Sequence, residues 1–251
     1  MILDDILKRT QKRVQNLPET FPDTNGHSHA SLKEAIRTAR VKNAVIAEIK
    51  CASQSAGIIR RNVDMAMMAG VLAGKGCIAL SVLTEPYYFG GRGSDIARVK
   101  ETVGVPVLRK DFIIDKRQIA ETRFLGADAV LLIAAVLKDR LPEFVDAAFS
   151  AGLEPLVEVH TAEEAACALS TKAELIGINN RDLATLCISR STTRILSEQV
   201  RAKNRIIVSE SGMRTADDIR EMRPYCDAFL IGSSIMAHLE PGKKLEEFVC
   251  A

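Results

Sequence analysis

The stretch VPVLRKDFIIDKRQIAETRFLGADAVLLI, residues 105–133, contains a complete strand–helix–strand unit. Residues 105–110 and 127–133 are short apolar runs rich in β-branched side chains, as buried strands are. Residues 116–125 between them have the mixed charged and apolar spacing of a surface helix. Gly126 stands where a left-handed residue would end that helix. Two strands joined in this way lie parallel in one sheet.

The same alternation of apolar runs and helical patterns continues through the chain from residue 45 onward. Eight candidate strands start at intervals of about 21 to 33 residues, as a series of strand–helix units would. The strands are Val45–Lys50, Ile78–Thr84, Val105–Lys110, Ala127–Ile133, Glu154–Val159, Leu175–Asn179, Ile206–Glu210 and Asp227–Ile231. Helical patterns include Val63–Ala73, Lys116–Leu125, Asp139–Ser150, Ala162–Leu169 and Thr215–Met222. Such a series folds either as a closed barrel or as a doubly wound open sheet.

The strand ends favour the closed barrel. No GxGxxG stretch follows the first candidate strand, which weakens the open dinucleotide-binding alternative. Most candidate strands end in Lys, Thr, Glu or Asn, and a barrel tolerates polar inward residues at the carboxyl ends of its strands. The length of 251 residues suits one barrel. We therefore predict an α/β fold, a (β/α)8 TIM barrel of eight parallel strands that forms a single domain over residues 1–251.

Residues 1–44 lie outside this pattern and predict a helical N-terminal extension. Ile2, Ile6 and Val14, with basic residues between them, indicate an amphipathic first helix, and residues 31–40 indicate a second. Two interpretations stay open from the residues alone. The extension could cap the bottom of the barrel, or it could fold over the carboxyl ends of the strands and help to close a substrate pocket.

Charge and cysteine content exclude several classes of protein. The 34 Lys and Arg residues nearly balance the 32 Asp and Glu, for a formal net charge of +2, and no basic cluster stands out. We therefore expect no nucleic-acid partner, although a small anionic substrate fits. The six cysteines form no CxxC pair and no zinc-site spacing with the histidines, so we expect no metal and a cytoplasmic location. We also expect no secretory signal and no membrane span, since no run reaches about 18 apolar residues.

Charged residues at several strand ends indicate acid–base chemistry. Glu48 and Lys50 stand two residues apart in the first strand and therefore share its inward face. Burying both charges is costly unless they pair or serve a ligand, and a simple buried ion pair is the alternative interpretation. Later strand ends carry Lys110, Glu158, Asn179 and Glu210. Two lysines and three glutamates that converge on one mouth predict a proton-transfer site.

Three polar residues beside these receive structural interpretations. Arg109 and Asp111 flank Lys110, so their side chains should point away from the barrel interior toward the surrounding helices. His160 could act as a general base, but a histidine just past a strand is more often a polar residue beside the next helix. We therefore leave His160 out of the predicted site.

Small residues after the last two strands predict a phosphate site. Ser211-Gly212 follows the seventh strand, and Gly232-Ser233-Ser234 follows the eighth. Backbone N–H groups in such turns, with a short helix at residues 235–238, bind phosphate in many barrels. A pair of ordinary tight turns is the alternative, because each turn alone is common.

Together, these residues resemble the indole-3-glycerol-phosphate synthases. The resemblance covers essentially the whole chain from residue 2, including an opening LDDIL at 3–7. The order LRKDFI, INNRDL, ESG and IGSS is highly specific, whereas other phosphate-binding barrels share only the final Gly-Ser feature. The matching stretches are IAEIK (46–50), ALSVLTE (79–85), VPVLRKDFIID (105–115), GADAVLLIA (126–134), PLVEVH (155–160), IGINNRDL (176–183), VSESGM (208–213) and FLIGSSIM (229–236).

The resemblance implies a decarboxylating lyase of tryptophan biosynthesis that uses no cofactor. Its small, anionic, phosphorylated substrate is 1-(2-carboxyphenylamino)-1-deoxyribulose 5-phosphate. An aromatic carbon attacks the ketose carbonyl, and loss of carbon dioxide and water then gives indole-3-glycerol phosphate. The resemblance also implies that residues 1–44 lie over the barrel mouth. We expect a monomer or a weak homo-oligomer.

By position, the resemblance implies a role for each predicted site residue. Lys110 corresponds to the general acid that protonates the ketone oxygen, and Lys50 to a lysine that contacts the substrate carboxylate and phosphate and is a candidate second acid. The other residues are Glu158 and Glu48 for proton transfers; Asn179, Glu210 and Ser211 for positioning the sugar hydroxyls and anilino nitrogen; Ser53, Gly212, Gly232 and Ser233 for phosphate; Phe112 and Leu131 for the aromatic ring; and Arg181 for further substrate binding.

The loop after the first strand departs from the family pattern. The family usually has Lys-Arg-Ala-Ser-Pro-Ser-Lys-Gly, whereas this chain has KCASQSAG at residues 50–57. Without the proline and the second lysine, the loop should be more flexible and less positive. Arg92 in the next strand's loop partly compensates for the lost charge. The departure bears on substrate affinity more than on reaction type.

Two alternative functions stay open from the sequence. A phosphoribosylanthranilate isomerase is another phosphate-binding barrel enzyme, but such isomerases lack the LRKDFI stretch. A catalytically silent barrel, retained as a scaffold, would not be expected to keep Glu48, Lys50, Lys110 and Glu158, because buried charges without a function are a liability.

Overall fold

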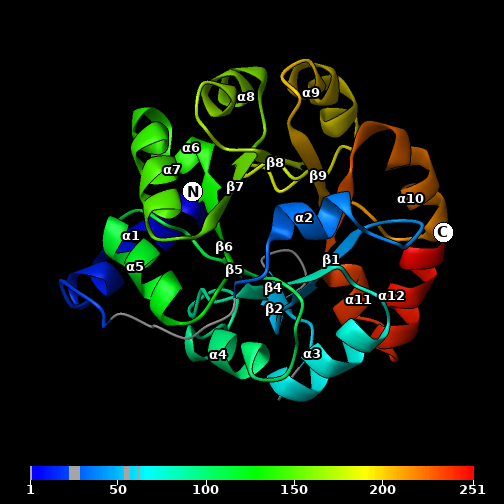
Figure 1. Cartoon of the computed structure of the whole chain (residues 1–251), viewed down its shortest axis with the longest axis horizontal. Helices are drawn as coiled ribbons and strands as arrows, with labels where there is room; N and C mark the ends of the chain where they lie inside the picture. Colours follow the sequence, from blue (N-terminus) through cyan, green and yellow to red (C-terminus); the bar gives the residue numbers. More distant parts are fainter. Residues whose placement is uncertain (1, 23–28, 54–56, 61–62) are drawn as a thin grey trace.

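Eight parallel strands close into a barrel, as the sequence predicts (Figure 1). The computed structural model describes residues 2–22, 29–53, 57–60 and 63–251. Each barrel strand pairs with the next barrel strand along the chain, and the last pairs with the first. The strands are β1 (Val45–Ile49), β4 (Ala79–Leu83), β5 (Val107–Lys110), β6 (Ala129–Ile133), β7 (Glu154–Val159), β8 (Leu175–Asn179), β9 (Ile206–Glu210) and β10 (Ala228–Ile231).

Helices connect successive strands and surround the barrel (Figure 1). The five predicted helices are all present, with ends within two residues of those expected. The helices are α3 (Met65–Gly74), α4 (Ser94–Lys100), α5 (Lys116–Phe124), α6 (Ala134–Leu137), α7 (Leu141–Ser150), α8 (Ala162–Leu169), α9 (Ser191–Arg201), α10 (Ala216–Met222), α11 (Ser233–Met236) and α12 (Pro241–Cys250), with the 3-10 turns η1 (Lys138–Arg140) and η2 (Arg223–Tyr225). A short hairpin of β2 (Ala52–Ser53) and β3 (Gly57–Ile58) follows β1.

Alternate residues of the strands belong to two separate cores. In β1, Val45, Ala47 and Ile49 pack outward against the helices, whereas Ile46 belongs to the core inside the barrel. Glu48 has the inward register of Ile46 and is only 3% exposed. The period-two alternation of a strand therefore carries the polar strand ends into the barrel mouth.

The N-terminal extension contacts both ends of the barrel. α1 (Ile2–Gln15) reaches the carboxyl ends of the strands, where Arg13 binds Asp111, just past β5, at 2.9 Å. α2 (Leu32–Arg37) lies at the amino ends, where Glu154 at the start of β7 accepts hydrogen bonds from its N-terminal turn. In Figure 1, α2 crosses in front of the ring of strands. The extension is thus divided between the two ends, and its action as a lid stays a prediction.

A buried carboxylate at the amino end is held by backbone groups and one lysine. Asp128, before β6, accepts hydrogen bonds from the N–H groups of Ala30 and Val107 at 3.0 and 2.7 Å. The ammonium of Lys100 lies 2.8 Å from the same carboxylate. These contacts join the start of α2, β5 and the end of α4, so they fasten the bottom of the barrel.

Helix ends follow the predicted signals with one difference. Gly126 and Gly152 have φ values of 86° and 74°, which is the left-handed conformation expected after α5 and α7. The Thr161 side chain accepts the N–H of Glu164 at the start of α8. The Glu164 carboxylate, however, accepts the N–H of His160 instead of returning to Thr161. A Thr-x-x-Glu pattern can form a capping box, in which each side chain bonds the backbone N–H of the other residue. Here the box is half formed, and the Glu164 carboxylate orients His160 instead.

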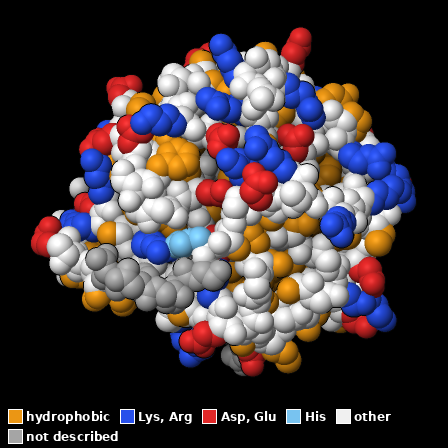
Figure 2. Space-filling model, viewed as in Figure 1, with side chains coloured by type: hydrophobic (Ala, Val, Ile, Leu, Met, Phe, Trp, Pro, Cys, Tyr) orange, Lys and Arg blue, Asp and Glu red, His pale blue; other side chains and the backbone are white. Residues whose placement is uncertain are grey.

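Basic and acidic side chains are interspersed over the face seen in Figure 2. Such a mixture differs from the basic stripe of a nucleic-acid-binding surface, and the absence of a nucleic-acid partner stays a prediction. Within the described part of the chain, no helix has both the length and the apolar character needed to cross a membrane.

Candidate active site

A cavity of about 540 Å³ opens at the carboxyl ends of the strands. This volume is that of a typical small-ligand site. The cavity is lined by thirteen of the fourteen predicted site residues, namely Glu48, Lys50, Lys110, Phe112, Leu131, Glu158, Asn179, Arg181, Glu210, Ser211, Gly212, Gly232 and Ser233. The remaining one, Ser53, belongs to β2, and its side chain lies outside the described part of the structure.

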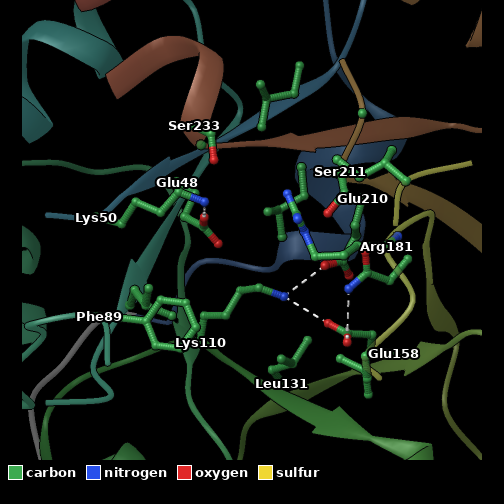
Figure 3. Close-up of a pocket in the computed structure, with 18 of the residues that line it drawn as sticks. Glu48, Lys50, Phe89, Lys110, Leu131, Glu158, Arg181, Glu210, Ser211 and Ser233 are labelled. Atoms are coloured by element: carbon green, nitrogen blue, oxygen red, sulfur yellow. Dashed lines mark hydrogen bonds and ion pairs between the residues drawn. The ribbon is translucent and has the colours of Figure 1, made fainter. Parts of the chain in front are cut away.

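Lys110 extends into the cavity between two carboxylates (Figure 3). Its Nζ lies 2.9 Å from Glu158 Oε2 and 2.8 Å from Glu210 Oε2. Lys110 lies at the carboxyl end of β5, Glu158 at that of β7 and Glu210 at that of β9. Their side chains are 15%, 3% and 2% exposed, respectively. Because these side chains are almost fully shielded from solvent, their charges depend on one another for stabilisation.

The two carboxylates on Lys110 differ in their tendency to ionise. Burial disfavours the ionised form of both. For Glu158, Lys110 and His160 outweigh burial and hold the pKa well below its usual value. For Glu210, burial dominates and raises the pKa to about 7, despite the charge of Lys110. Burial also disfavours the ammonium of Lys110, but Glu158, Glu210 and Glu48 together raise its pKa above the usual value.

Glu48 and Lys50 form a second ion pair in the cavity. Lys50 Nζ lies 2.6 Å from Glu48 Oε1, and the two side chains are 13% and 4% exposed. The backbone just after β10 passes beside them at Gly232, where a Cβ would collide with Glu48 Oε1 and would lie 3.0 Å from Lys50 Cε. A side chain at position 232 would therefore displace this ion pair. The two residues do pair, as the simpler interpretation expects, but they do so on the cavity wall.

The turn after β9 and the turn after β10 are bonded to each other. Ser211 and Gly212 have φ values of 64° and 90°, so both adopt the left-handed conformation. This conformation is rare for serine and turns the chain sharply at the cavity wall. The Ser234 hydroxyl donates a hydrogen bond to the carbonyl oxygen of Met213 and joins the two turns.

The short helix after β10 starts earlier than the sequence suggests. α11 begins at Ser233, whereas the predicted turn covers residues 235–238. Gly232 has an irregular conformation just before it, so the helix begins as soon as the strand ends. Ser233 and Ser234 both line the cavity. The first N–H groups of α11 are thus available near the predicted phosphate position.

Asn179 and Arg181 extend the site along the end of β8. The Asn179 side chain donates to Glu158 Oε1 at 3.1 Å and accepts the N–H of Arg181 at 3.0 Å. Burial and the neighbouring guanidinium of Arg214 lower the pKa of Arg181. Arg214 also lines the cavity and was not predicted from the sequence. Its place directly after the VSESGM stretch is the signal that could have identified it.

Apolar residues complete the cavity wall. Phe112 and Leu131 line it as predicted, and Phe89, Leu183 and Leu186 join them from the loops after β4 and β8. The loop residues were missed because an isolated apolar side chain in a loop has no periodic signal. The cavity therefore combines an apolar wall with ionised groups, as a site for an aromatic anion needs.

Arg109 points outward, as predicted. Asp111 makes the predicted contacts with the surrounding helices but also lines the cavity, which was not predicted. The guanidinium of Arg109 is 2% exposed and binds Asp111, the Gln118 carbonyl and the Thr122 hydroxyl at 3.0 to 3.1 Å. Asp111 also accepts two hydrogen bonds from Arg13 of α1. This network attaches α1 and α5 to the strand that carries Lys110.

His160 lies behind Glu158, outside the lining of the cavity. Its Nε2 is 3.3 Å from Glu158 Oε1, and its Nδ1 is 3.1 Å from Glu164 Oε2. The sequence indicated a polar residue beside the next helix, and the contact with Glu164 of α8 confirms that interpretation. The contact with Glu158 was not predicted.

The altered loop after β1 lacks a lysine that the family usually has, and the structure shows in part which cation takes its place. Residues 54–56 of the KCASQSAG stretch lie outside the described residues. Arg92, which we expected to compensate for the missing lysine, is exposed and is not among the residues that line the cavity. Arg214 supplies a lining cation instead. In the described ranges, no group of three or more His, Cys, Asp or Glu side chains is placed to hold a metal ion.

Paired ammonium and carboxylate groups at the carboxyl end of a closed barrel are the usual constellation of a (β/α)8-barrel enzyme with acid–base chemistry. The position of the cavity and the Lys110–Glu158–Glu210 cluster within it place this protein in that class.

Known proteins narrow the class to one family. Residues 3–248 match the family model described as indole-3-glycerol phosphate synthase. The chain is 42% identical to an indole-3-glycerol phosphate synthase of Caldanaerobacter subterraneus subsp. tengcongensis, over 99% of this chain and 98% of that one. It is also 42% identical to the enzyme of that name from Methanocaldococcus jannaschii, over 98% and 91%. The chain belongs to the indole-3-glycerol phosphate synthase family.

A solved structure from another protein shares the fold alone. A tryptophan synthase chain from M. tuberculosis superposes with a TM-score of 0.65 at 13% identity, over 88% of this chain and 99% of that chain.

Proposed function

We propose that this protein catalyses the indole-3-glycerol-phosphate synthase reaction of tryptophan biosynthesis. It converts 1-(2-carboxyphenylamino)-1-deoxyribulose 5-phosphate into indole-3-glycerol phosphate, carbon dioxide and water. The observation that carries this proposal is the Lys110 ammonium, held between Glu158 and Glu210 in a cavity of ligand size. Family membership over nearly the whole chain supports the same reaction.

Ring closure is the step for which we assign Lys110 as the proton donor. An aromatic carbon attacks the ketose carbonyl, so negative charge develops on the carbonyl oxygen. An ammonium held between Glu158 and Glu210 is oriented before substrate arrives. Its raised pKa keeps it protonated until that oxygen, which becomes a strong base in the transition state, takes the proton.

Dehydration needs one group to remove a proton and another to protonate the leaving hydroxyl. Glu158 and Glu48 are our candidates for these transfers, because each lies within 3 Å of a lysine that can exchange protons with it. Glu210, Asn179 and Ser211 would position the sugar hydroxyls and the anilino nitrogen from the same cavity wall.

The two anionic groups of the substrate suit two cationic parts of the cavity. The linked turns at Gly212 and Gly232–Ser233 would bind the phosphate through backbone N–H groups, with Lys50 beside them. Arg181 and Arg214 repel each other, and a bound anion would relieve that repulsion.

The apolar wall would hold the aromatic ring. Phe112 and Leu131 line the cavity with Phe89, and an anthranilate ring buried against them loses contact with water. Decarboxylation is favoured when the carboxylate moves away from its cationic partner, because the carboxylate then loses that stabilisation.

The test is turnover of the anthranilate–deoxyribulose phosphate, followed by the fluorescence of the indole product. We expect product formation without added metal or cofactor. Isomerisation of phosphoribosylanthranilate in the same assay would instead support the isomerase alternative. No turnover of either compound by the folded protein would support a silent scaffold.

Location and assembly also belong to this proposal. We place the protein in the cytoplasm, because all six cysteines are unpaired, as expected for a reducing compartment. We expect a monomer or a weak homo-oligomer, which light scattering over a range of protein concentrations would test.

A further inference from the structure

The two carboxylates that hold Lys110 have different surroundings on their second oxygens. Glu158 Oε1 accepts a hydrogen bond from the Asn179 amide at 3.1 Å. It also forms an ion-pair contact of 3.3 Å with His160 Nε2, which is buried and makes no hydrogen bond among the described residues. Glu210 Oε1 is buried and has no hydrogen-bond partner among the described residues. Lys110 does not distinguish the two carboxylates, because its Nζ lies 2.9 Å from Glu158 Oε2 and 2.8 Å from Glu210 Oε2. Any difference between the carboxylates must therefore come from the groups behind them.

His160 is held firmly in its place behind Glu158. Its Nδ1 lies 3.1 Å from Glu164 Oε2, and the same oxygen accepts the His160 backbone N–H at 2.8 Å. The histidine side chain is only 9% exposed. An imidazole with a carboxylate at each ring nitrogen is stabilised in its doubly protonated, positively charged form.

Every charged group that faces His160 favours this positive form. Glu158 approaches from β7, Glu164 from α8 and Asp182 from the loop after β8. Burial alone would lower the pKa of His160, but its contacts with Glu158 and Glu164 raise the pKa to about 10. Lys110 is an opposing cation, and it contacts the other oxygen of Glu158.

Two carboxylates that share one lysine in a buried site do not ionise independently. We propose that His160 is a positioning residue: as an imidazolium held by Glu164, it keeps the negative charge of the Glu158–Glu210 pair on Glu158 and the proton on Glu210. Of the two carboxylates on Lys110, the His160 cation contacts only Glu158, so it stabilises one distribution of charge over the other. Glu210 also faces the carboxylate of Glu48, and among the described residues Lys110 is the cation bonded to it.

The consequence for turnover rests on the proposed function. With the charge fixed on Glu158, that residue enters each cycle as the proton acceptor, and Glu210 enters it as a neutral hydrogen-bond donor. Without His160, the proton would distribute over both carboxylates. A fraction of the protein molecules would then hold Glu158 in its protonated form, which cannot accept a proton.

The charge assignment can be tested without any substrate, by following the histidine ring signals with NMR as a function of pH. The chain has four histidines, so the His160 signal is the one lost in His160→Gln. We expect His160 to stay protonated through neutral pH and to titrate near pH 10. Glu158→Gln should lower the pKa of His160 by about one unit or more. Glu210→Gln is the matched control and should leave it nearly unchanged. A neutral His160 at pH 7, or equal responses to both variants, would overturn the proposal.

Kinetics then test the effect on turnover. In His160→Gln, the pKa of Glu158 should rise, so the acid limb of the kcat/KM profile should move up by about one pH unit. KM should change less than about threefold, because His160 does not line the cavity. Glu164→Gln should move the limb in the same direction by less, and it serves if His160→Gln does not fold. A uniform loss of rate with an unchanged pH profile would reduce His160 to a packing role and refute the proposal.

The two tests separate this inference from the proposed function. If the parent protein fails to turn over the substrate, the proposed function is wrong, while the NMR titration still decides the charge assignment. If the parent turns over normally but His160 titrates as a neutral ring at pH 7, only the inference fails.

Discussion

The two ends of the barrel both bury charged side chains, but they use them differently. At the amino end, both oxygens of Asp128 are occupied by backbone N–H groups and by Lys100. At the carboxyl end, Lys110 is held by the side chains of Glu158 and Glu210, and one oxygen of Glu210 has no hydrogen-bond partner in the described ranges. A buried charge bonded to backbone amides fixes one structure. A buried charge that faces other side chains and an open cavity can still exchange its partner for a ligand.

This contrast predicts that substitutions at the mouth will cost activity and that substitutions at the bottom will cost stability.

Replacing Lys110 should give the largest loss. Lys110→Met removes the assigned proton donor, so we expect kcat to fall by about two orders of magnitude or more. Steady-state kinetics and circular dichroism would measure rate and folding. The matched control is Lys100→Met at the amino end, which should keep kcat while lowering the melting temperature. A kcat for Lys110→Met within about threefold of the parent would make Lys50 the better candidate for the acid.

Gly232→Asp should act on substrate binding. The new side chain would meet Glu48 and Lys50 and would place a negative charge at the predicted phosphate position. We expect KM to rise about 10- to 100-fold, the value of one or two lost charged hydrogen bonds. Gly104→Asp is the control, since a Cβ there meets nothing within 4 Å. Inorganic phosphate should compete with substrate in the parent, and absence of competition at high phosphate would contradict the assignment.

Truncation separates the two helices of the extension. Removal of residues 1–20 deletes α1 with Arg13, so we expect a folded barrel whose kcat/KM falls by about tenfold. Removal of residues 1–40 also deletes Leu32, which is fully buried in the inner core, and should add a loss of stability. Circular dichroism, thermal unfolding and turnover would be compared for both chains. Full activity after the first truncation would exclude a lid role for α1.

Lys50→Met should affect binding more than chemistry. Lys50 lies beside Glu48 and Gly232 on the predicted phosphate side, so we expect KM to rise about five- to tenfold with a smaller fall in kcat. The measurement is a comparison of kcat and KM between Lys50→Met and Lys110→Met. The same kcat loss in both variants would mean that the two lysines cannot be assigned separate roles.

Asp128→Asn should give the smallest change and leave activity alone. The amide retains an acceptor for one backbone N–H but loses the ion pair with Lys100, so we expect unfolding to become easier by about 1 to 2 kcal/mol. Urea unfolding would measure this loss, and kcat/KM should stay within about twofold of the parent. A larger kinetic effect than a stability effect would contradict the contrast between the two ends.

The sequence predicted the barrel and most of the cavity because both depend on strand periodicity. Once Ile46 is assigned to the inner core, Glu48 must point inward as well, and the same argument applies to Lys110, Glu158 and Glu210. Resemblance to the family supplied Phe112 and Leu131, which periodicity alone would have left as ordinary core residues.

What the sequence missed lies where periodicity ends. His160 and Arg214 follow a strand, and nothing in a two-residue period says where a side chain points after its strand has stopped. The position of α2 was open for a related reason: an amphipathic pattern shows which face of a helix is buried but not which end of the barrel buries it. Glu164 could be assigned to a capping box, but its second partner, the His160 ring, depends on loop geometry.

The pairing of β1 with β10 has a consequence for folding during synthesis. About 180 residues separate the end of β1 from the start of its partner. At a synthesis rate of about 5 to 20 residues per second, β1 leaves the ribosome on the order of ten to forty seconds before β10 exists. During that interval one edge of a strand in which every residue but Glu48 is apolar is unpaired, and an unpaired apolar edge invites association with other chains. A nascent barrel of this kind therefore depends on fast synthesis, or on chaperones that cover the unpaired edge until β10 has been made.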